Sequence, residues 1–73
     1  MLSKKFGIVL HDLRKESKLS QEKLAELAGY DRTYISLLER GLRQPTITTI
    51  FELSKALNIS ASTIIKAVED AIA

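Results

Sequence analysis

The chain has 73 residues and a formal net charge of +2, which suits one small domain with a modest core. It has no cysteine, one histidine and no apolar run near the roughly 20 residues of a membrane span, which excludes a disulfide framework, a thiolate metal site and a transmembrane helix. Charges interrupt the apolar patch near the N-terminus, so we expect no signal peptide. We expect a soluble, cytoplasmic protein that binds no cofactor, no metal and no membrane.

Positive charge is concentrated in the first part of the chain. Residues 1–43 hold nine Lys or Arg against six Asp or Glu, whereas residues 44–73 hold two against three. A basic excess confined to one part is typical of a protein that meets phosphate groups with that part.

The first predicted helix spans about Ser3 to Lys18. We expect Ser3 to cap its N-terminus, and Lys15 and Lys18 to complement the negative end of its dipole. Gly7 lowers the helix propensity within this segment. The apolar side chains recur at the spacing of one helix face: Phe6, Val9, Leu10 and Leu13.

Residues 20–41 have the pattern of a helix-turn-helix. Ser20 is expected to cap the first of these two helices, and the small Ala25 lets the helices cross closely. Gly29 supplies the left-handed backbone that a tight turn demands, Asp31 caps the second helix, and Gly41 ends it. The first of these helices turns three side chains inward: Leu24, Leu27 and Ala28.

Two more helices are predicted over about residues 46–71, with caps at Thr46 and Ser60 and a left-handed Asn58 between them. The fourth helix has an apolar stripe of five side chains: Ile47, Ile50, Phe51, Leu53 and Leu57. Because no strand pattern or repeat occurs, residues 1–73 are predicted to form one all-α domain of five short helices.

The fifth helix carries a broad arc of four apolar side chains: Ile64, Ile65, Val68 and Ile72. One interpretation places all four in the small core. The other makes part of the arc a homodimer interface, because an exposed aliphatic strip on so small a protein favours association.

The third predicted helix turns two kinds of side chain in opposite directions. At about 100° per residue, Tyr34, Ile35 and Leu38 face the protein. The opposite arc consists of Arg32, Thr33, Ser36, Leu37 and Arg40 and holds no acidic residue. Side chains of these types suit DNA, because Arg, Ser and Thr can form hydrogen bonds with base edges and methyl groups can contact thymine.

The segment LSQEKLAELAGYDRTYISLLERG, followed by PTI and LSKALNIS, resembles the Cro-type, lambda-repressor-like helix-turn-helix family, also called XRE-like regulators. The similarity extends from Phe6 to about Asp70. The DRTYIS and ERG elements look most like the small controller proteins of restriction-modification systems, and phage and plasmid repressors share them. The resemblance implies a transcriptional regulator that binds a pseudo-palindromic double-stranded DNA operator as a homodimer.

The same resemblance implies a role for individual residues. It implies base contacts by Arg32, Thr33, Ser36 and Leu37, and contacts to DNA phosphates by Gln21, Tyr34, Arg40 and Arg43. Leu37 departs from the phage pattern, in which a polar residue often reads a base. Arg14 and Glu39 match a partly buried ion pair that joins the first helix to the third.

Two other function classes fit the sequence less well. An antitoxin or another protein-binding module can use the same fold and bind a partner through a helix face. An enzyme is disfavoured, because the carboxylates lie at positions expected on exposed helix faces, His11 has no partner fixed by a motif, and no glycine-rich phosphate loop occurs. We therefore expect no catalytic residues and no small-molecule substrate.

Overall fold

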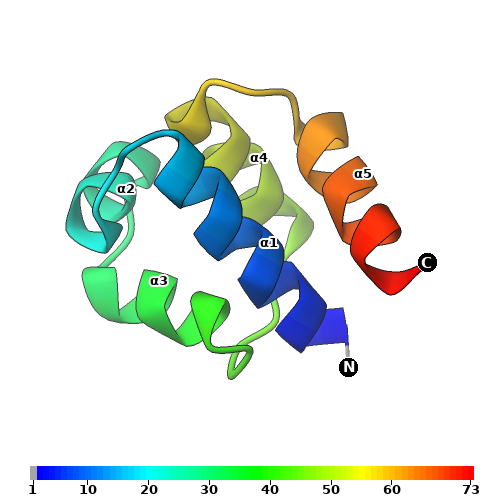
Figure 1. Ribbon diagram of the computed structural model, residues 1–73. Coiled ribbons are helices and arrows are strands. Elements are labelled where there is room, and N and C mark those ends of the chain that lie inside the picture. The colour runs from blue at the N-terminus through cyan, green and yellow to red at the C-terminus, as the bar shows by residue number, and fades with distance from the viewer. Residues whose placement is uncertain (1) are drawn as a thin grey trace.

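The computed structural model describes residues 2–73 and shows five helices and no strand in that range (Figure 1). The helices are α1 Leu2–Glu16, α2 Gln21–Ala28, α3 Arg32–Glu39, α4 Ile47–Leu57 and α5 Ala61–Ile72. The predicted all-α, five-helix architecture is therefore confirmed. No helix within residues 2–73 has the length and apolar character needed to span a membrane.

The helices surround one core, to which each of them contributes. α1 packs against α3 and α5, α2 against α3 and α4, and α4 against α5 (Figure 1). Burying one Leu or Ile side chain stabilises a fold by roughly 1.5–3 kcal/mol, so the fully buried residues dominate the packing energy. The largest of them are Leu10, Leu24, Ile35, Leu38, Leu53 and Ile64.

Four of the helices end in the same type of turn. In each turn one residue has a left-handed backbone, and the next N–H donates to the carbonyl five residues back, as in a Schellman motif. The left-handed residues are Lys18 (φ 60°), Gly29 (φ 81°), Gly41 (φ 75°) and Asn58 (φ 59°). Three of these turns were predicted, but α1 ends two residues before the predicted Lys18, which closes its turn instead.

The starts of the helices agree with the sequence in most cases. Ser20, Thr46 and Ser60 each accept a hydrogen bond from the backbone N–H three residues on, as predicted for N-caps. Asp31 occupies the cap position of α3, but its side chain makes no cap hydrogen bond. Ser3 was predicted to cap α1 and lies inside that helix instead, where its Oγ donates to Gln44 Oε1 at 3.3 Å.

Some apolar side chains of the predicted helix faces are exposed. Leu27 was predicted to face inward and is exposed, and so are Ile47 and Phe51 from the predicted apolar stripe of α4, because α2 and α4 are covered by neighbours on one side only. Of the two interpretations of the α5 arc, the core interpretation is confirmed for Ile64 and Val68, which are buried where α5 packs on α1 and α4, so the dimer-interface interpretation is wrong for these two residues. Ile65 and Ile72, from the same predicted set, are exposed.

Gly7 lies where α1 crosses the end of α3. A Cβ atom at this position would stand 2.5 Å from the Glu39 carbonyl oxygen and 2.6 Å from that of Leu38. Only glycine, which has no side chain, lets the backbones of α1 and α3 come this close. Gly7 therefore lowers the helix propensity of α1 but allows close packing of α1 against α3.

Candidate nucleic-acid interface

One face of α3 anchors the helix and the other meets solvent. Ile35 and Leu38 are fully buried, and they fix α3 against α1 and α2. Of the predicted outward arc, Arg32, Thr33 and Arg40 are exposed, while Ser36 and Leu37 are partly exposed. Tyr34 lies at the margin between the two faces and is half-buried. The arc is thus available to a partner along its whole length.

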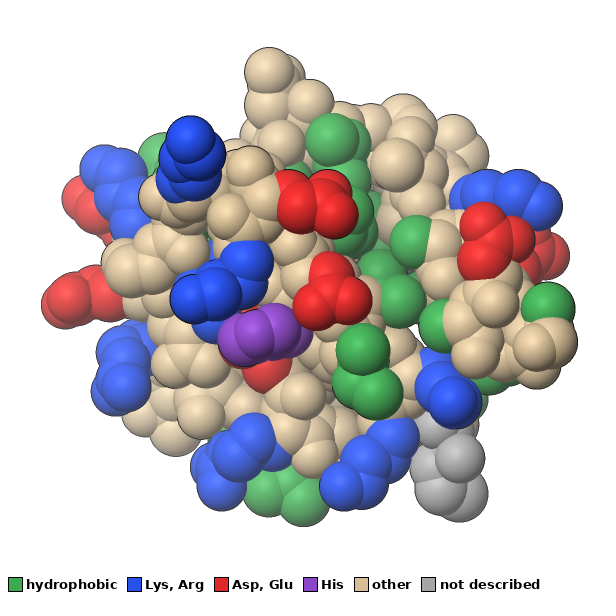
Figure 2. Space-filling model, in the orientation of Figure 1, with side chains coloured by type: hydrophobic (Ala, Val, Ile, Leu, Met, Phe, Trp, Pro, Cys, Tyr) green, Lys and Arg blue, Asp and Glu red, His purple; other side chains and the backbone are tan. Residues whose placement is uncertain are grey.

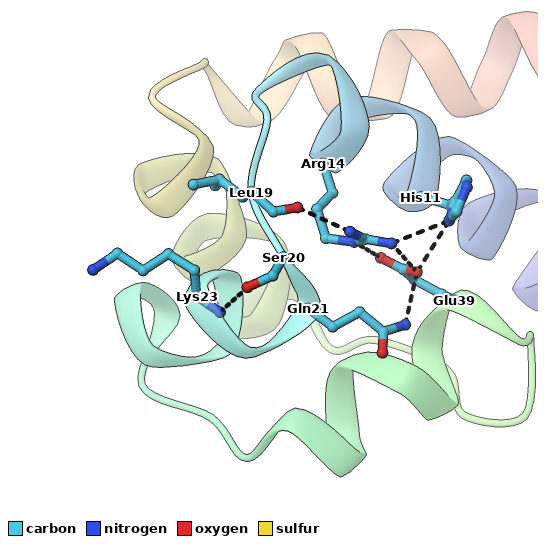
Figure 3. A network of polar contacts seen from close by, with 7 residues as sticks. All are labelled: His11, Arg14, Leu19, Ser20, Gln21, Lys23 and Glu39. Carbon is cyan, nitrogen blue, oxygen red and sulfur yellow. Dashed lines mark hydrogen bonds and ion pairs between the residues drawn. The ribbon is translucent and has the colours of Figure 1, made fainter.

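A buried ion pair joins the end of α3 to α1 (Figure 3). Arg14 Nε donates to Glu39 Oε2 at 2.6 Å, and the Arg14 Nη2 donates to Glu39 Oε1 at 3.1 Å. The Arg14 Nη1 donates to the carbonyl of Leu19 at 2.9 Å, just before α2. The two side chains are 9% and 5% exposed, so the sequence-predicted pair is present and largely shielded from water.

The same carboxylate holds Gln21, the first residue of α2. Gln21 Nε2 donates to Glu39 Oε1 at 3.0 Å, and His11 Nδ1 lies 3.2 Å from the same oxygen (Figure 3). Burial alone raises the pKa of the Glu39 carboxyl, but the hydrogen bonds from Arg14, Gln21 and His11 outweigh it, with the Arg14 charge adding to them. The net effect lowers the pKa of Glu39 below its ordinary value of 4.5, so the charged form is favoured.

A second polar cluster links α3 to the start of α4. The hydroxyl of buried Thr49 lies 3.1 Å from Tyr34 Oη, 3.4 Å from Tyr30 Oη and 3.0 Å from Thr46 Oγ1. The two tyrosine rings pack against each other with their centroids 4.9 Å apart and their planes tilted by 42°. The Arg43 guanidinium carbon lies 5.6 Å from the Tyr34 ring centroid, within cation–π range. Tyr34 is therefore fixed, and it places Arg43 beside α3.

Basic side chains surround a hollow between the end of α1, the start of α2 and the start of α3. This hollow, of about 640 Å³, is lined by eight residues: Arg14, Lys15, Lys18, Leu19, Ser20, Gln21, Glu22 and Arg32. Within residues 2–73, only Arg14 among its four basic side chains makes an ion pair. In Figure 2, Lys and Arg side chains also follow the lower margin of the molecule, near α3, while acidic ones lie higher.

Some residues of the candidate interface were predicted from the sequence and others were not. Thr49, which fixes Tyr34, was not singled out, because a Thr-x-x-Thr spacing at a helix start indicates only a cap. No sequence motif fixes a partner for His11, and its contact with Glu39 comes from a distant helix. Across residues 2–73, no three His, Asp or Glu side chains gather closely enough to hold a metal ion.

Known proteins share both the sequence pattern and this arrangement. A helix-turn-helix family model matches residues 10–64. Control protein C.SmaI of Serratia marcescens is 51% identical over 47 residues, which are 64% of this chain and 56% of that protein. The chain spans 39% to 62% of the length of the first curated relatives that it matches.

Two solved structures are similar over nearly their whole length. The restriction-modification controller protein C.AhdI from Aeromonas hydrophila superimposes with a TM-score of 0.82 and 42% identity, covering 85% of this chain and 94% of that one. The controller protein C.Esp1396I, solved as a tetramer in complex with its natural 35-base-pair operator, gives a TM-score of 0.90 and 33% identity, covering 99% and 95%. The family match and these structures agree on the helix-turn-helix over α2 and α3.

Proposed function

The chain belongs to the helix-turn-helix family, and we propose that it is a transcriptional regulator that binds a pseudo-palindromic DNA operator as a homodimer. In this role residues 1–73 act as one DNA-binding unit of the restriction-modification controller type, working in the cytoplasm without catalysis. The observation that carries the proposal is the exposed, acid-free arc of α3, which two buried anchors and a buried ion pair hold in place.

Sequence readout is assigned to the outward arc of α3. Arg32 stands in the first turn, the part of a recognition helix that enters the major groove deepest. Its guanidinium forms no hydrogen bond or ion pair elsewhere in residues 2–73 and is free for the O6 and N7 atoms of a guanine. Thr33, Ser36 and Leu37 supply two hydroxyls and a methyl-bearing contact along the same arc.

Phosphate contacts are assigned to residues that flank this arc: Gln21, Tyr34, Arg40 and Arg43. Gln21 has its amide oriented by Glu39 and retains a second Nε2 hydrogen for a phosphate oxygen. Arg43 is held over the Tyr34 ring, and Arg40 is exposed at the end of α3. Contacts of this kind fix the position of the protein on DNA and make its affinity depend on salt.

Replacing Arg32 with Ala is expected to weaken binding to the specific operator by about 1–3 kcal/mol and to relax the preference at one base pair per half-site. Folding should be unaffected because the side chain is exposed. Arg32→Lys should restore only part of the loss, since Lys lacks the planar two-pronged donor. The measurement compares bound-site preference and melting temperature of the three proteins. A folded Arg32→Ala variant with unchanged base preference would move Arg32 from readout to phosphate binding.

The dimer contact is assigned to an apolar surface formed by α4 and α5. Ile47 is 72% exposed, and Phe51, one turn further along α4, is 56% exposed. Ile65 and Ile72 lie seven residues apart on the exposed face of α5. Ile47 and Ile65 line one groove of about 210 Å³ with Leu2 and Pro45. We propose that a second copy of the chain packs on this surface. The two copies of the homodimer would then bind two half-sites about 34 Å apart.

Phe51→Asp is expected to weaken dimerisation by at least roughly 30-fold, the effect of losing one aromatic hot spot worth about 2 kcal/mol, because each of the two protomers loses one. The monomer should stay folded, because Phe51 projects from the core. Leu27→Asp is the matched control, since Leu27 is equally apolar and exposed but lies on α2. Sedimentation over a dilution series measures both variants. If both substitutions weakened dimerisation equally, or if neither weakened it, the dimer contact would have to lie elsewhere.

A further inference from the structure

Lys18 has a left-handed backbone conformation, which is unfavourable for a lysine. It closes the turn after α1 with φ 60°, while glycine or asparagine fills the equivalent place after α2, α3 and α4. A left-handed backbone brings Cβ close to the following carbonyl, which glycine avoids and asparagine tolerates. Hydrogen bonds from Lys18 N to Lys15 O at 3.0 Å and from Leu19 N to Arg14 O at 3.2 Å hold the turn in this form. A residue kept in a strained conformation suggests that its side chain has a use.

The side chain of Lys18 is exposed and lines the hollow between α1, α2 and α3. Gln21 and Arg32, proposed to contact DNA, line the same hollow, and so does Lys15. Lys15, Lys18 and Arg32 form no ion pair within residues 2–73, and Glu22 is the one acid that faces them without an ion pair of its own. Positive charge thus prevails in a concave surface beside the first turn of the recognition helix.

We propose that Lys18 binds a phosphate of the DNA backbone next to the one held by Gln21, extending the interface from α2 and α3 onto the turn after α1. This inference rests on the proposed function. The ligand is the phosphodiester chain of duplex DNA, whose charges lie alongside the groove that α3 enters. An ammonium on a flexible stem suits a contact that requires charge but no fixed geometry.

The turn itself needs no lysine. Its hydrogen bonds come from backbone groups and from Arg14 to the Leu19 carbonyl, and none uses the Lys18 side chain. Lys18→Gly should therefore raise the melting temperature by about 4 °C, by removing the conformational strain. It should also weaken binding to all DNA sequences alike, by about eightfold per protomer at 0.1 M salt, and reduce the slope of log affinity against log salt by about 0.9 per protomer.

Titrations of a random-sequence 35-base-pair duplex and of a duplex from bound-site selection, at four salt concentrations, test this inference. Lys18→Gly and Lys18→Gln should both lose affinity and slope, Lys18→Arg should retain them, and the control Lys66→Gln on α5 should match the wild type. Since Lys18→Gly is expected to be more stable than the wild type, its lower affinity cannot come from unfolding.

The outcomes separate the two proposals. Wild-type protein that binds neither duplex would overturn the proposed function. Wild-type protein that binds with salt dependence, together with a Lys18→Gly variant of unchanged affinity and slope, would overturn the phosphate contact and leave the proposed function standing. A loss at one base position alone would also overturn it, because phosphate contacts carry no sequence information.

Discussion

Replacing Glu39 with Ala is expected to destabilise the protein by about 3–5 kcal/mol, the cost of removing one partner of a buried ion pair. The Arg14 guanidinium would remain in a site where its side chain is 9% exposed, with its best acceptor gone. Gln21 would also lose the carboxylate that orients it. Small domains have a total stability of about 5–15 kcal/mol, so this substitution should remove a large share of the stability while leaving a transition that can be measured. Urea unfolding measures the loss.

A double substitution and a pH series show whether the charge pair is the cause. Arg14→Leu combined with Glu39→Leu should recover much of the stability, because no buried charge is left unpaired. The pKa of Glu39 is lower in the folded chain, so the unfolded chain takes up the proton first as pH falls. The stability that Glu39 supplies is therefore complete above pH 4.5 and is lost below it. If the difference in the free energy of unfolding between wild type and Glu39→Ala stayed the same in acid, the charge on Glu39 could not be the cause of the stabilisation.

Gly7→Ala is expected to destabilise the protein by roughly 1–3 kcal/mol or more, as overpacking does in a close helix contact. The added Cβ would meet two backbone carbonyl oxygens at 2.5 and 2.6 Å, and backbone cannot rotate away as a side chain can. On an exposed helix the same change would stabilise by about 1 kcal/mol, so the sign of the effect is decisive.

Ile8→Ala provides the control for this position, because Ile8 is the exposed neighbour in the same helix. It should change the free energy of unfolding by much less than Gly7→Ala. If Gly7→Ala instead raised the melting temperature, α1 and the end of α3 would have to lie further apart than in this structure.

Local signals explain what could be predicted from the sequence. Caps at Ser20, Thr46 and Ser60 and the left-handed Gly29 and Asn58 depend on contacts within a few residues, and these features are present in the structure. The outward arc of α3 also follows from helix geometry alone. These features were enough to place α3 and its exposed side chains.

Features that depend on distant helices could not be predicted in the same way. An apolar stripe on α4 or α5 does not show which side its neighbours cover, so the sequence alone could not show that Phe51 is exposed or choose between core and interface for Ile64. Gly7 lowers helix propensity wherever it stands, and only the position of α3 reveals its purpose. The link from Thr49 to Tyr34 crosses 15 residues of sequence and has no local pattern.

We propose that the exposed arc of α3 reads DNA within a symmetric dimer. Selection of bound sites from random duplexes by the wild-type protein tests this proposal. We expect an enriched pseudo-palindrome whose half-sites are about one helical turn apart, with a guanine in each half-site that loses its enrichment in Arg32→Ala. Recovery of sequences without symmetry or base preference, from a protein shown to be folded, would contradict it.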